Sequence, residues 1–84
     1  MTKHYVNKDD PTGGYYEIFT GELGSRWHWV ETAEGVEYKD YGQWSQTPAA
    51  AYRDAANDWE ANGNPSNRRL GGQLRAAATR SEGK

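Results

Sequence analysis

The sequence predicts an α+β domain: an antiparallel meander of three to four strands packed against one main helix, with a weak helix at the C-terminal end. In the first half of the chain, segments rich in β-branched and aromatic residues alternate with short glycine-containing turns. Short turns join antiparallel strands, because parallel pairing needs a longer crossover. In the second half, alanine and aromatic residues recur at helical spacing.

Four segments have the composition of strands. Residues 3–7 and 15–20 lie on either side of a turn rich in aspartate, proline and glycine. Residues 26–31 and 36–41 follow, and the compact hairpin that joins them ends at Gly35, a residue suited to a left-handed conformation. This order predicts consecutive hairpins in one sheet.

The third strand segment has the clearest alternation. Its period of two places Trp27 and Trp29 on one face. The opposite face then carries Arg26, His28 and Val30. We expect the two tryptophans to lie in the core between sheet and helix.

The main helix has both start and stop signals. Thr47 can cap its amino end, and Pro48 suits the first helical position. Gly63 and Pro65 predict its end. Its apolar stripe consists of Ala49, Tyr52, Ala55, Ala56 and Trp59.

The last segment has a weaker helical pattern. Leu70, Leu74, Ala77 and Ala78 have helical spacing, but two glycines at 71–72 each cost up to about 1 kcal/mol relative to alanine. We therefore divide the chain into a sheet-plus-helix domain, residues 1–65, and a basic C-terminal tail or short helix, residues 66–84.

Charge is distributed unevenly between these two parts. Residues 1–65 hold eleven acidic and five basic side chains, a balance of −6, whereas residues 66–84 have a balance of +4. The net charge of −2 conceals an acidic body with a basic tail.

No catalytic apparatus is recognisable in the sequence. There is no cysteine, and His4 and His28 do not have zinc-site spacing. Phosphate-loop and nucleophile-elbow patterns are missing as well. We predict a protein that is not an enzyme and uses no metal and no cofactor; the remaining enzymatic hypothesis, a base at His28, has no substrate to accompany it.

The amino terminus has no apolar run, and no stretch reaches membrane-spanning length. We expect a cytoplasmic protein without a membrane partner, either a monomer or a small homo-oligomer.

Two surfaces are candidates for binding. The first is an acidic, aromatic region of the sheet, which is either a solvated face or a patch for a basic protein partner. Its best contact candidates are Arg26, Glu31, Glu34, Glu37, Tyr38 and Asp40. The second is the basic tail, which could contact nucleic acid as the alternative function. Its residues are Arg68, Arg69, Arg75 and Arg80.

A short motif carries a resemblance to known domains. Residues 41–47 (YGQWSQT), followed by Ala51, Ala55 and Ala56, resemble the three-stranded-sheet-plus-helix domains of plant ethylene-response factors and the arm-binding domains of tyrosine integrases. That resemblance implies DNA binding by the exposed strands. This chain departs from the pattern, because its strands offer Arg26 and Lys39 among many acids. The departure argues against DNA binding by the sheet.

In size and acidity the chain resembles small inhibitor proteins of bacteriophages and mobile elements, anti-CRISPR proteins among them. The resemblance implies a phage-type inhibitor that covers a basic, nucleic-acid-binding surface of a host protein. A small antitoxin-like domain is similar in the same general way. Nucleic acid is the less favoured partner.

Overall fold

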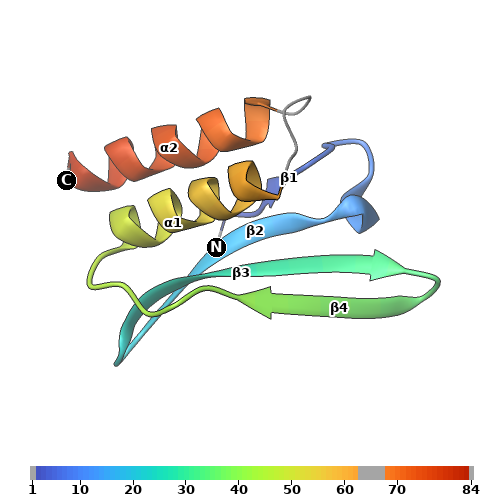
Figure 1. Ribbon diagram of the computed structural model, residues 1–84, viewed down its shortest axis with the longest axis horizontal. Helices are drawn as coiled ribbons and strands as arrows, with labels where there is room; N and C mark the ends of the chain where they lie inside the picture. Colours follow the sequence, from blue (N-terminus) through green and yellow to red (C-terminus); the bar gives the residue numbers. More distant parts are fainter. Residues whose placement is uncertain (1, 63–67, 84) are drawn as a thin grey trace.

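A four-stranded antiparallel sheet with two helices on one side of it makes up the computed structural model, which describes residues 2–62 and 68–83 (Figure 1). The α+β class, the antiparallel meander and the main helix on the sheet are thereby confirmed. The strands lie in sequence order: β1 (His4–Tyr5), β2 (Tyr15–Gly21), β3 (Gly24–Ala33) and β4 (Val36–Tyr41). The helices are α1 (Pro48–Ala61) and α2 (Arg68–Glu82).

The hairpin turns explain why the middle strands are longer than predicted. Gly21 pairs with Gly24 and Ala33 pairs with Val36, so each turn has only two central residues. In the second turn Glu34 has φ 53° and Gly35 has φ 77°. Two positive φ values are what a type I′ turn requires, and that turn matches the twist of the flanking strands.

Strand β1 is shorter than the predicted residues 3–7, because the chain leaves the sheet for a short 3-10 helix, Pro11–Gly13. The side chain of Asp10 caps this helix by accepting a hydrogen bond from the Thr12 N–H. Gly14, which follows, has φ 114°, and a Cβ there would lie 2.4 Å from the Trp29 ring. Only glycine therefore fits where the chain enters β2.

Helix α1 begins as its sequence predicts. The Thr47 hydroxyl accepts a hydrogen bond from the Ala50 N–H at 3.2 Å, and Pro48 is the first helical residue. Asn62 caps the carboxyl end. The predicted stop signals, Gly63 and Pro65, lie outside the described residues.

The core lies between the sheet and the two helices. Trp27 and Trp59 are buried in it, as expected, while Trp29 and Tyr52 are partly buried at its edge. Small alanines on α1 let this helix approach the rings closely. The buried members are Tyr16, Ile18, Trp27, Ala51, Ala55, Ala56, Trp59, Leu70 and Leu74.

Helix α2 is more substantial than its sequence predicts. It has 15 residues and packs against α1, with Leu70 and Leu74 completely buried. Burying a leucine side chain contributes about 1.5–3 kcal/mol, which for two leucines outweighs a cost of up to about 1 kcal/mol for each glycine. Packing on α1 thus overrides the weak local propensity.

The other face of the sheet is not covered by either helix (Figure 1). Register places there the side chains that alternate with the core positions, among them Phe19, Arg26, His28 and Tyr41. The molecule consequently offers three distinct regions for contacts: this uncovered face, the β3–β4 hairpin, and the edge formed by β1 and α2.

Candidate functional site

The exposed end of the β3–β4 hairpin, residues 31–41, carries five of the six predicted protein-binding residues. Every residue from 31 to 41 is exposed. Pairing places Glu31 opposite Tyr38 and Trp29 opposite Asp40, so these side chains share the helix-facing side of the sheet. Glu37 points to the uncovered face, where it pairs with Lys39 at 3.3 Å, and Glu34 lies in the turn. The predicted residues are therefore divided between two faces of one hairpin.

Arg26, the sixth predicted residue, lies on the uncovered face within an aromatic cluster. Its guanidinium carbon is 4.6 Å from the Tyr41 ring centroid and 4.4 Å from that of Trp44. Its Nε donates to Nε2 of His28 at 3.3 Å, and Phe19 stacks on the same imidazole. Burial, followed by the charge of Arg26, lowers the pKa of His28. The aromatic rings of this cluster therefore already contact a cation of the chain, the guanidinium of Arg26.

The four arginines of the basic segment have different surroundings. Arg69 donates to the backbone carbonyls of Tyr5 and Val6, which fastens α2 to β1. Arg75 forms an ion pair with Glu60 at 2.8 Å. This pairing, through its hydrogen bonds above all, lowers the pKa of Glu60 and raises that of Arg75. Arg68 and Arg80 are exposed.

Arg80 contributes to a basic pocket between α2 and the amino-terminal strand. The pocket has a volume of about 390 Å³ and is also lined by Lys3, Lys8 and Gln73. His4 also lines it, is 8% exposed, and its Nε2 has no hydrogen-bond partner. Burial and the nearby charge of Arg80 lower the pKa of His4. The structure thus brings one predicted arginine together with two lysines from the opposite end of the sequence.

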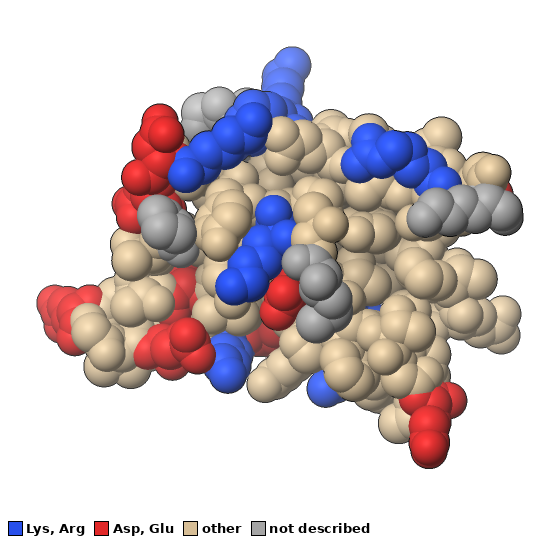
Figure 2. Space-filling view, turned by 180° about the vertical axis from the view of Figure 1, so that it is seen from behind, with Lys and Arg blue, Asp and Glu red and all other residues tan. Residues whose placement is uncertain are grey.

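Figure 2 shows both kinds of charge on one face of the molecule, with lysines and arginines in blue mostly over its upper and central parts and acids in red mostly at its edges, apart from one beside the central basic side chain. The two kinds of charge are not fully separated, since Arg75 of α2 forms an ion pair with Glu60 of α1.

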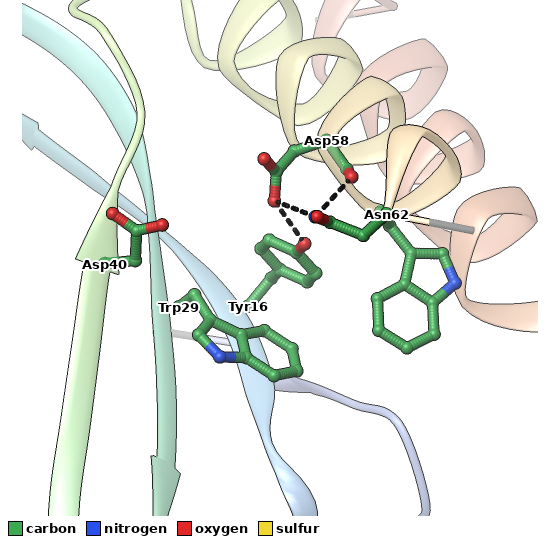
Figure 3. Close-up of a pocket in the computed structure, with 6 residues that line it drawn as sticks. Tyr16, Trp29, Asp40, Asp58 and Asn62 are labelled. Carbon is green, nitrogen blue, oxygen red and sulfur yellow. Dashed lines mark hydrogen bonds between the residues drawn. The ribbon is translucent and has the colours of Figure 1, made fainter. Parts of the chain in front are cut away.

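A second pocket lies on the helix side of the sheet, between β4 and the carboxyl end of α1 (Figure 3). Its volume is about 250 Å³. Asp40 approaches it from the strand and Asp58 from the helix, with Tyr16 and Trp29 between them. The complete lining is Tyr16, Trp29, Asp40, Asp58, Trp59 and Asn62.

Hydrogen bonds hold this second pocket in shape. The Tyr16 hydroxyl donates to Asp58 Oδ2 at 2.7 Å, and the Asn62 amide donates to the Asp58 carbonyl at 2.8 Å. Burial raises the pKa of Tyr16, and the hydrogen bond and negative charge of Asp58 and the charge of Asp40 raise it further. Tyr16 therefore stays protonated and keeps donating to Asp58.

The sequence predicted one member of this pocket, Asp40, as a contact residue, whereas Trp29 and Trp59 were expected in the core. The signal that identifies the rest is a pair of aspartates four residues apart on the sheet-facing side of α1. Asp54 accepts from the Trp27 indole at 2.9 Å, and Asp58 accepts from Tyr16. Carboxylates in a helix that covers a sheet rich in Trp and Tyr have indole and phenol donors to bind.

Residues 2–62 and 68–83 contain no group of three or more His, Cys, Asp or Glu side chains arranged to hold a metal ion. Neither described helix has the length and apolar character needed to cross a membrane.

Comparison with protein-family models, with curated proteins and with solved structures gives no match to this chain.

Proposed function

We propose that this protein is a non-enzymatic binding module whose β3–β4 hairpin docks on a basic surface of a protein partner. The observation that carries the proposal is the exposed hairpin itself. Residues 31–41 include four acidic side chains and a single lysine, Lys39, and all of them are exposed. Carboxylates on such a projection accelerate association with a positively charged surface.

The helix-facing side of the hairpin is the better contact surface. Glu31, Tyr38 and Asp40 lie together there, and exposed Val36 and Tyr38 add apolar area. On the opposite side, Glu37 already pairs with Lys39 and Arg26 is enclosed by aromatic rings. A central ring surrounded by charged groups is the usual composition of a protein interface.

The kind of partner follows from the charge. A basic protein surface that normally binds nucleic acid carries the positive potential that the hairpin complements. By occupying that surface, this protein would act as an inhibitor of the phage or mobile-element type. It resembles such inhibitors in its small size and acidity.

Partner capture followed by charge reversal tests the proposal. The partner is isolated by pull-down from the native host, with nuclease-treated and untreated lysates compared. Glu31→Lys combined with Glu34→Lys should then slow association at least about tenfold at low salt and change its salt dependence. Glu22→Lys, in the exposed turn at the other end of the sheet, is the control for the single variant Glu34→Lys, which changes the net charge by the same amount. Unchanged association of the double variant would refute the proposal.

A second function, nucleic-acid binding, is favoured by one observation: Arg80 shares a pocket with Lys3 and Lys8. Three cations around one cavity suit a phosphate group. Arg69 and Arg75 add little to this surface, since both make contacts within the fold.

A gel-shift titration at low salt on duplex and single-stranded DNA and RNA tests this second function. Binding should weaken steeply as salt is added. Lys8→Gln combined with Arg80→Gln should abolish the shift, whereas Arg75→Gln should leave most of it. No shift at high micromolar protein would eliminate this candidate.

A further inference from the structure

Aromatic rings on the uncovered face of the sheet already have cations of the chain itself. Arg26 lies between Tyr41 and Trp44, and Lys3 lies 4.9 Å from the ring centroid of Tyr15. The pocket on the helix side is different. Among the residues that the structure describes, its lining combines aromatic rings with the carboxylates of Asp40 and Asp58 and includes no lysine or arginine. It therefore has the groups that attract a cation without containing one.

The rings of this pocket form a continuous wall. Tyr16 and Trp29 have ring centroids 4.8 Å apart, and those of Trp29 and Trp59 are 6.0 Å apart. Trp29 is only partly buried, so part of its indole faces the cavity. Rings of this kind attract an organic cation by their quadrupole, most strongly when they are tryptophans.

Three sources of negative potential converge on the same space. Asp40 and Asp58 lie on two sides of it (Figure 3). The third is the carboxyl end of α1, because Asp58 and Asn62 belong to its last turn and cap, and that turn contains no basic residue. A helix carries a partial negative charge at its carboxyl end, which favours a cation.

We propose that this pocket receives an arginine side chain of the basic partner, with its guanidinium stacked on Trp29 and hydrogen-bonded to Asp40 and Asp58. A planar guanidinium suits both contacts, since it stacks on aromatic faces and binds carboxylates through paired N–H groups. A volume of about 250 Å³ suits one side chain, because pockets for drug-sized ligands measure about 300–1,000 Å³. The inference deepens the proposed function, because Asp40 belongs to both the hairpin and the pocket. It rests on that function, since the arginine belongs to the basic protein partner proposed there.

Nuclear magnetic resonance of the four indole N–H groups tests the inference directly. The probe is the peptide acetyl-Gly-Arg-Gly-amide, and the control is the same peptide with citrulline, which keeps the shape of arginine but has no charge. The arginine peptide should shift the Trp29 and Trp59 signals. The Trp27 signal should stay, because this indole is buried and bonded to Asp54. Trp44 reports on the uncovered face.

A matched pair of variants tests whether the Asp40 carboxylate contributes to peptide binding. Asp40→Asn should weaken peptide binding about tenfold, as expected for a lost charge-assisted contact. The fold should tolerate it, since Asp40 is exposed and its side chain accepts one hydrogen bond, from the adjacent Tyr41 N–H. Glu22→Gln removes the same charge at a remote turn and should change affinity less than about twofold.

Three outcomes would overturn the inference: equal shifts with the citrulline peptide, shifts confined to Trp44, or unchanged affinity of Asp40→Asn. The peptide experiment and the partner experiment can fail separately. If the hairpin reversal weakens partner binding but the arginine peptide leaves Trp29 and Trp59 unshifted, the pocket inference fails alone. If the peptide binds but the hairpin reversal has no effect, the proposed function fails.

Discussion

The acidic hairpin and the basic helix α2 carry opposite charges and differ in how those charges are used. On α2, Arg69 binds backbone carbonyls of the amino-terminal segment, and Arg75 pairs with Glu60 of α1. On the hairpin, the one ion pair among the described residues joins Lys39 to Glu37. The arginines of α2 therefore contribute more to the tertiary structure than the carboxylates of the hairpin, which remain accessible. Formal charge counted along a sequence predicts a binding surface only where the side chains have no contacts within the fold.

The largest effect on stability should come from weakening the packing of α2 against the core. Leu74→Ala should lower the free energy of unfolding by about 2–5 kcal/mol, because Leu74 is completely buried. Urea denaturation followed by circular dichroism measures this, with Ala76→Ser on the exposed side of α2 as the control. A loss below about 1 kcal/mol would mean that α2 does not contribute to the core as described.

A smaller effect should distinguish two neighbouring arginines. Arg69→Gln should destabilise the fold by about 1 kcal/mol through loss of its bonds to the Tyr5 and Val6 carbonyls. Arg68→Gln should change stability by less than about 0.5 kcal/mol, since Arg68 is exposed. Equal effects in the same denaturation assay would contradict a structural role for Arg69.

Lowering the pH should reduce the stability that His4 contributes to the fold. His4 is buried, its pKa is lowered, and an unfolded histidine has a pKa of 6.5. Stability from this group is therefore complete above that value and declines as the pH falls through it, because the unfolded state binds the proton first. The decline stops below the lowered pKa of the folded state.

Thermal unfolding measured between about pH 5 and pH 7 checks this expectation. His4→Phe, which keeps a ring against Tyr52, should reduce the pH dependence. His28→Gln should retain the part that His4 contributes, although the pKa of His28 is also lowered. A His4→Phe variant with the same pH dependence as the original protein would exclude His4 as its source.

The smallest effect is expected at the acidic hairpin. Glu31→Gln and Glu34→Gln should each change the free energy of unfolding by less than about 0.5 kcal/mol, because both side chains are exposed. The same urea assay checks this result. A loss above about 1 kcal/mol would mean that these carboxylates stabilise the fold, and the contrast with α2 would disappear.

The local structure of this protein could largely be predicted from its sequence. Alternation around Trp27 and Trp29, the turn at Gly35 and the cap at Thr47 each depend on residues close together in the chain. Alternation also places the tryptophan faces correctly, because successive side chains of a strand point to opposite sides. The strength of α2 could not be predicted in this way, since Leu70 and Leu74 gain their stability from α1 and the sheet.

The candidate sites were predictable only in part, and the reason is again distance along the chain. Sequence alone determined that the hairpin is acidic and that the C-terminal segment is basic. Tertiary structure decided that Arg75 pairs with Glu60, that Arg80 and Lys3 line one pocket, and that Asp40 and Asp58 lie on two sides of another. Each of these pairs joins different elements, and only the packing of helices on the sheet brings such residues together.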